Sequence, residues 1–164
     1  MKRCVAGVTL IEMMLAITVL AILLGLAVPS FKEAGLGSQL RSASSEMIAS
    51  VNLARSEAIK RNAPVSLCVS SDGASCGAGG WEQGWIVIAG GSLIQKQPAA
   101  PTGFRISALS ATTTVTFQPT GVGATPATFT ICRATPSGGH QERVVTIDAA
   151  GRATSRRTTT GVCA

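Results

Sequence analysis

Hydrophobic residues are nearly continuous from Val8 to Val28, where Glu12 is the one charged residue. As an α-helix this run rises to roughly 30 Å, which matches the thickness of a bilayer core. The basic residues Lys2 and Arg3 precede it, and basic flanks stay on the cytoplasmic side. The pattern predicts a single membrane span, with the rest of the chain outside the cytoplasm.

From residue 29 to residue 62 the pattern changes to one apolar face of a helix. Apolar residues recur at steps of three and four, as in an amphipathic helix: Leu36, Leu40, Ala43, Met47, Val51, Ala54 and Ala58. Pro29, Gly35 and Gly37 predict a bend or a partly melted turn within the helix. Pro64 predicts its end.

After residue 63 short segments rich in β-branched residues alternate with Gly, Pro, Asp and Ser, as in antiparallel strands. We expect strands within residues 65–70, 84–91, 92–97, 104–109, 113–119, 127–134 and 142–155. Gly90 and Gly91 lie where two of these segments meet, which predicts a hairpin turn. The fold class is therefore α+β, with a long N-terminal helix packed on an antiparallel sheet in a β-rich domain over residues 63–164.

The charge balance limits the choice of partners. The 164 residues include 14 Lys and Arg against 8 Asp and Glu, a net charge of +6. Without Lys2 and Arg3 the balance is 12 to 8, or +4. This bias is too weak by itself to identify nucleic acid as a partner.

Four cysteines follow the apolar run and a fifth, Cys4, precedes it. An even number of cysteines outside the cytoplasm indicates disulfides. Three pairings are possible and sequence does not choose among them. We favour Cys68 with Cys76, which closes a short loop, and Cys132 with Cys163. A zinc site is the alternative, although no Cys-x-x-Cys pair occurs and His140 is the single histidine.

Candidate catalytic groups are few. The acidic residues are scattered without the paired spacing of an acid and a base, and no serine lies in a nucleophile motif. The glycines of residues 77–80 lack the Gly-Lys-Ser/Thr of a phosphate loop. We expect a protein that is not an enzyme, with no cofactor and no metal.

Glu12 is the unusual residue of the apolar run. A carboxylate in a membrane span costs on the order of 2–3 kcal/mol and usually finds a partner within an assembly. The alternative is a glutamate that lies at the membrane surface.

The stretch Gly7-Val8-Thr9-Leu10-Ile11-Glu12, followed by the apolar run and Pro29, resembles the class III signal and N-terminal helix of type IV pilins and type II secretion pseudopilins. The resemblance implies that a prepilin peptidase cleaves after Gly7 and that the new N-terminus, Val8, is methylated. It also implies that Glu12 neutralises the N-terminal amine of a neighbouring subunit. Val8 departs from the usual phenylalanine. The chain then divides into a leader (1–7), a transmembrane assembly helix (8–28), a helical continuation (29–62) and the domain over residues 63–164.

The second half resembles the GspH/FimT/FimU-like branch of minor pilins and pseudopilins, in residues 54–68, 81–88, 115–121, 129–134 and 143–152. This implies a structural subunit in the priming or tip complex of a type IV pilus, with other major and minor pilins as partners. After assembly it would lie in the extracellular filament of a Gram-negative bacterium. The alternative is a GspH-like minor pseudopilin of a type II secretion system.

The C-terminal residues are basic, and the candidates for DNA binding are Arg143, Arg152, Arg156 and Arg157. Guanidinium groups can bind the phosphates of DNA independently of its nucleotide sequence. FimT-like proteins bind DNA in natural transformation through a Gly-Arg-x-Arg element, which this chain resembles in part: Gly151-Arg152 matches, but Thr154 replaces the second arginine. The alternative is an exposed basic tail anchored by Cys163.

Overall fold

The computed structural model describes residues 7–134 and 141–159, with the backbone alone at residue 26 and residues 28–33. The chain forms two compact units, Met1–Ser38 and Gln39–Ala164. Helix α1 (Leu10–Arg61) supplies residues to both units. In the described part of the chain, no helix is long and apolar enough to cross a membrane, whereas the sequence predicts a span over residues 8–28.

Helix α1 is unbroken through Pro29, Gly35 and Gly37, so the expectation of a partly melted turn there is wrong. Its C-terminus is closed by Asn62, which adopts a left-handed φ of 50°. The backbone N–H of Asn62 donates to Ile59 O, and that of Ala63 donates to Ala58 O. These two bonds form a Schellman motif and satisfy the last carbonyls of the helix. The predicted end of the helix near Pro64 is thus confirmed.

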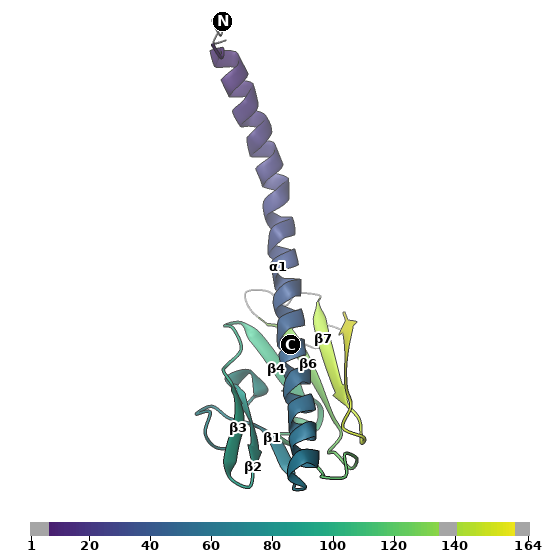
Figure 1. Cartoon of the computed structure of the whole chain (residues 1–164). Helices are drawn as coiled ribbons and strands as arrows, with labels where there is room; N and C mark the ends of the chain where they lie inside the picture. The colour runs from purple at the N-terminus through teal and green to yellow at the C-terminus, as the bar shows by residue number, and fades with distance from the viewer. Residues whose placement is uncertain (1–6, 135–140, 160–164) are drawn as a thin grey trace, which may run out of the picture. The chain divides into compact units, whose positions relative to one another are not determined.

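Within the described residues, the strands form two antiparallel sheets of four strands each (Figure 1). The first has the order β3-β2-β1-β5 and the second β4-β6-β7-β8. In chain order the elements are β1 (Val65–Val69), the 3-10 helix η1 (Trp81–Gln83), β2 (Trp85–Ala89), β3 (Ser92–Gln97), β4 (Phe104–Ala108), the 3-10 helix η2 (Leu109–Ala111), β5 (Thr114–Phe117), β6 (Ala127–Arg133), β7 (Glu142–Ile147) and β8 (Ala153–Thr158).

The predicted hairpin at Gly90 and Gly91 is confirmed, because both residues have positive φ (53° and 84°) between β2 and β3. The segment over residues 142–155 differs from the prediction, since it makes two strands, β7 and β8. Asp148 N–H donates to Arg152 O and Gly151 has a φ of 70°, which turns the chain back on itself.

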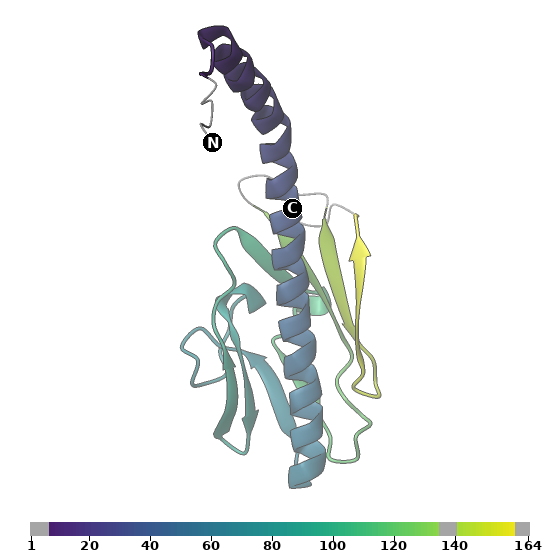
Figure 2. The same cartoon turned by 45° about the horizontal axis from the view of Figure 1, so that its top comes forward.

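In the second unit, α1 lies across one face of both sheets in both views (Figure 1, Figure 2). The stripe residues of this unit face its core, where Leu40, Ala43, Met47, Val51, Ala54 and Ala58 are buried. Leu36, the first residue of the predicted stripe, belongs to the first unit. Phe117 of the first sheet and Phe129 of the second are also buried. The α+β class with a helix on antiparallel sheet is therefore confirmed, with two sheets in place of one.

Polar contacts fix the helix on the sheets. Trp85 Nε1 donates to Ser50 Oγ at 2.9 Å in a buried position. Arg55 donates from Nε and Nη2 to the carbonyl oxygen of Gly121, at 3.2 and 3.1 Å. These bonds join α1 to β2 and to the loop before β6.

Candidate functional site

The N-terminal segment, up to Gly25, is apolar and exposed. Every described side chain from Val8 to Gly25 is exposed; Leu10, for example, is 78 % exposed. A helix that is apolar all round is stable when lipid or other helices surround it. The hydroxyl of Thr18 is satisfied within the helix, because it donates to the backbone oxygens of Met14 and Leu15.

Glu12 lies at the third position of α1, within its first turn. Its backbone N–H donates to Thr9 Oγ1 at 3.3 Å, and its own Oε2 accepts the N–H of Thr9 at 3.5 Å. This reciprocal pair is a capping box, a Thr-x-x-Glu arrangement at a helix N-terminus. The carboxylate also sits at the positive end of the helix dipole. Thr9 was missed at the sequence level, although the Thr-x-x-Glu spacing could have identified it.

Beside Glu12 the helix surface forms a shallow apolar strip. Its residues are Leu15, Ala16, Val19, Leu20 and Leu23. A carboxylate at one end of such a strip can accept a cation, while the strip can pack against another apolar helix. Gly7 and Val8 lie just before α1 and are exposed. Pro29 lies further along α1, within the same unit.

The disulfide between Cys68 and Cys76 is present and closes the loop between β1 and η1. Cys132 is also disulfide-bonded. Cys163, its expected partner, and Cys4 lie outside the described residues, so the pairing of Cys132 with Cys163 stays a prediction. His140 likewise lies outside them.

Asp72 organises the disulfide loop. Its carboxylate accepts the backbone N–H groups of Ser75 and Ala74 and the hydroxyls of Ser75 and Ser70. The backbone bond from Ser75, followed by the others, holds the pKa of Asp72 well below its usual value. The loop is thereby fixed at both its disulfide and its carboxylate.

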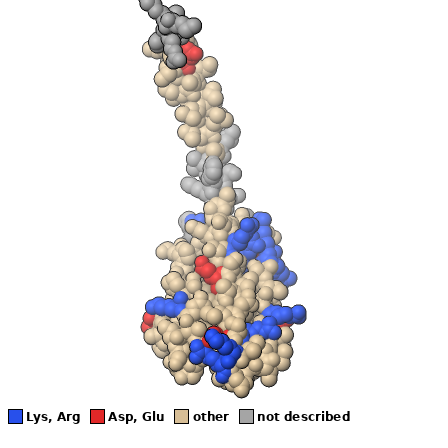
Figure 3. All heavy atoms as spheres, in the orientation of Figure 1, with Lys and Arg blue, Asp and Glu red and all other residues tan. Residues whose placement is uncertain are grey.

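The four candidate arginines are brought together only in part. Arg143 of β7 lies directly opposite Arg157 of β8, on the face of the sheet that carries buried Ile131 of β6. Figure 3 shows basic side chains grouped over this side of the second unit. Like charges directly opposite each other destabilise a strand pair, so this Arg143–Arg157 pair would favour an anion beside it.

Arg156 and Arg152 lie elsewhere. Arg156 is opposite Val144, so its side chain points to the other face of the sheet. Arg152 lies in the turn before β8, where its Nε contacts Asp148 Oδ2 at 3.0 Å. The N–H of Arg152 and then its guanidinium lower the pKa of Asp148. The predicted set of four is therefore split among three places.

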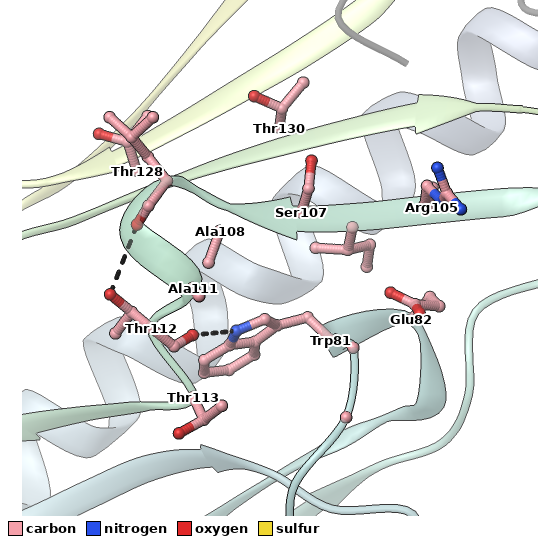
Figure 4. Close-up of a pocket in the computed structure, with 14 residues that line it drawn as sticks. Trp81, Glu82, Arg105, Ser107, Ala108, Ala111, Thr112, Thr113, Thr128 and Thr130 are labelled. Carbon is pink, nitrogen blue, oxygen red and sulfur yellow. Dashed lines mark hydrogen bonds between the residues drawn. The ribbon is translucent and has the colours of Figure 1, made fainter. Parts of the chain in front are cut away.

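A groove of about 580 Å³ lies beside β4 (Figure 4). Ser107, Thr128 and Thr130 contribute hydroxyls from β4 and β6, and Arg105 and Glu82 contribute charges. Trp81 Nε1 donates to Thr112 O at 2.7 Å and holds η1 against the loop before β5. Glu82 is the one carboxylate among the lining residues, so the groove offers hydrogen bonds without an acid–base pair. No local motif identifies these residues, because four separate segments supply them.

Among residues 7–134 and 141–159, no group of three or more His, Cys, Asp or Glu side chains could hold a metal ion.

Comparisons with known families give two matches. The profile of the type II transport protein GspH family matches residues 43–151, and that of the prokaryotic N-terminal methylation motif matches residues 2–28. No curated protein sequence matches significantly.

Two solved structures share the fold. The type IV minor pilin FimU of Pseudomonas aeruginosa is 27% identical, with a TM-score of 0.59, over 73% of this chain and 89% of FimU. The minor pseudopilin EpsH of the Vibrio cholerae type 2 secretion system is 15% identical, with a TM-score of 0.50, over 75% of this chain and 98% of EpsH. EpsH supports the fold alone.

Proposed function

The chain belongs to the type II transport protein GspH family, and from this premise we propose that it is a minor pilin, a structural subunit that enters a type IV pilus through α1. The observation that carries the proposal is the position of Glu12 at one end of an exposed apolar strip, within the residues that match the N-terminal methylation motif. The similarity to the minor pilin FimU favours a pilus.

In this proposal a prepilin peptidase cleaves after Gly7 and Val8 becomes the methylated N-terminus. The inner membrane holds the subunit before assembly, with the second unit in the periplasm. The Glu12 carboxylate then pairs with the N-terminal ammonium of a neighbouring subunit, and the apolar strip packs against that subunit's helix. Burying a carboxylate beside a cation in this way stabilises the assembly only when both charges are paired.

The test is to recover the chain from filaments. The full chain, carrying an epitope tag inserted at the exposed Gly90-Gly91 turn, is produced in its host, filaments are sheared off, and the N-terminus is read by mass spectrometry. The proposal expects N-methylated Val8 in the filament fraction. Recovery of a chain that still begins at Met1, and only from membranes, would overturn it.

The alternative is a minor pseudopilin of a type II secretion system, which the family description favours. Deleting the gene separates the two functions. Loss of surface pili with normal protein secretion supports the pilin, whereas loss of secretion with normal pili supports the pseudopilin. Neighbouring genes for other minor pilins or for secretion-channel components provide an independent check.

A second candidate function is DNA binding at the filament surface, as in natural transformation, and the Arg143–Arg157 pair favours it. Two guanidinium groups side by side suit consecutive phosphates. The test measures the mobility shift of duplex DNA at low salt with the unit that starts at Gln39. The double variant Arg143→Gln/Arg157→Gln should lose most retardation, and Arg152→Gln/Arg156→Gln should lose less. Negligible retardation by the unsubstituted protein would exclude the role.

A further inference from the structure

The start of α1 separates the proposed cleavage site from the helix. The first intrahelical bond runs from the N–H of Met13 to Thr9 O, at 3.2 Å. Thr9 is therefore the N-cap residue, and Gly7 and Val8 lie outside the helix. Val8 is 66 % exposed, and no atom lies within 4 Å of the place where a side chain on Gly7 would begin. The Gly7–Val8 bond thus lies outside the helix and is exposed.

The capping box is what holds the helix start at this residue. The Thr9 hydroxyl and the Glu12 carboxylate each accept a backbone N–H that helix geometry leaves without a partner. If Thr9 entered the helix, its side chain could no longer cap, and the start would move toward Val8 and Gly7. The amide of the Gly7–Val8 bond would then be wound into the first turn, where a protease reaches it less readily.

We propose that Thr9 is a positioning residue for the processing step, because its cap keeps the Gly7–Val8 bond outside α1. The inference rests on the proposed function, since it assumes a prepilin peptidase. In the step, water adds across the Gly7–Val8 amide, which leaves a carboxylate on Gly7 and an ammonium group on Val8. Thr9 touches neither reacting atom and acts through the backbone conformation alone.

The experiment follows cleavage of the full chain in detergent micelles by a purified prepilin peptidase whose activity is verified on a type IV prepilin. Thr9→Val removes the hydroxyl at nearly constant volume and should lower kcat/KM by about two- to thirty-fold, the fold-change to which the cost of losing an N-cap converts. Thr9→Ser keeps the hydroxyl and should be cleaved at the normal rate. Thr18→Val removes a hydroxyl from the same helix, away from the cap, and should also be cleaved normally.

A second readout is the backbone conformation of Val8 in the uncleaved chain, measured by NMR Cα chemical shifts. It should be non-helical in the unsubstituted chain and become helical in Thr9→Val.

The outcomes separate the two claims. No cleavage of the unsubstituted chain, while the control prepilin is cleaved, overturns the proposed function. Suppose that the unsubstituted chain is cleaved normally and that Thr9→Val changes neither the cleavage rate nor the Val8 chemical shift. This result overturns the role of Thr9 and leaves the proposed function standing. A slower rate without a change at Val8 also contradicts it, because the effect would then arise from direct contact with the peptidase.

Discussion

Arg55 joins α1 to the loop before β6 by donating two hydrogen bonds to the carbonyl oxygen of Gly121, at 3.2 and 3.1 Å. The same side chain packs beside Gly151, at the β7–β8 turn. One residue of the helix therefore fixes two loops of the second unit.

Replacing Arg55 with methionine should destabilise the second unit. The change keeps most of the aliphatic stem but removes both donors, so the free energy of unfolding should fall by about 1–2 kcal/mol. Urea unfolding of the unit that starts at Gln39 measures this. Arg41→Met, at an exposed position of the same helix, is the matched control and should change stability little. Equal stability of the two variants would show that the Arg55 bonds contribute nothing.

Ser50→Ala should also destabilise the unit. It leaves Trp85 Nε1–H buried without its acceptor, and an unsatisfied buried donor costs about 1–3 kcal/mol. Thermal unfolding followed by tryptophan fluorescence reports the loss. Ser56 lies on the exposed side of the helix and its hydroxyl donates to Leu53 O, so Ser56→Ala is the control. A drop of similar size in both would show that loss of the Trp85 bond is not what destabilises Ser50→Ala.

The disulfide loop gives a third prediction. Replacing Cys68 and Cys76 together with alanine should lower the free energy of unfolding by about 2–3 kcal/mol, because a short crosslinked loop restricts the unfolded chain. The double variant is preferable to a reducing agent, because a reducing agent would also break the disulfide of Cys132. Unchanged urea midpoints would mean that the loop has no part in stability.

Asp72 makes stability depend on pH. Its pKa is lower in the folded chain than its ordinary value of 3.8, so its contribution is complete above that value. The contribution is lost as pH falls below 3.8 toward the folded pKa. The melting temperature should therefore decline in acid, and Asp72→Asn should decline less steeply over the same range. Parallel curves for the two proteins from pH 7 to pH 2 would contradict this assignment.

Much of the fold could be predicted because local patterns specify it. The stripe from Leu40 to Ala58 predicts the buried face of α1, since burial follows helical spacing. Gly90 and Gly91 predict the β2–β3 turn, since both adopt positive φ. The division into two sheets could not be predicted, because β5 pairs with the distant β1 and β4 pairs with β6. No local signal specifies such pairings.

The candidate sites show the same limit. Gly7, Val8 and Glu12 are neighbours in sequence, so one motif identifies them together. The four arginines looked like one basic group in the sequence, but alternation along β8 sends Arg156 and Arg157 to opposite faces. Asp148 in turn engages Arg152 at the turn. A basic stretch therefore becomes a site only where strand register places its charges on one face.

Glu12→Gln tests the central claim, assembly through α1, most directly. Glutamine can still cap Thr9 but carries no charge, so processing and membrane insertion should be normal. The amount of the variant in sheared filaments, quantified by mass spectrometry against the unsubstituted chain, should fall by at least about ten-fold, because a buried ammonium of the neighbouring subunit would lose its partner. Equal amounts of the two proteins in the filaments would contradict the claim.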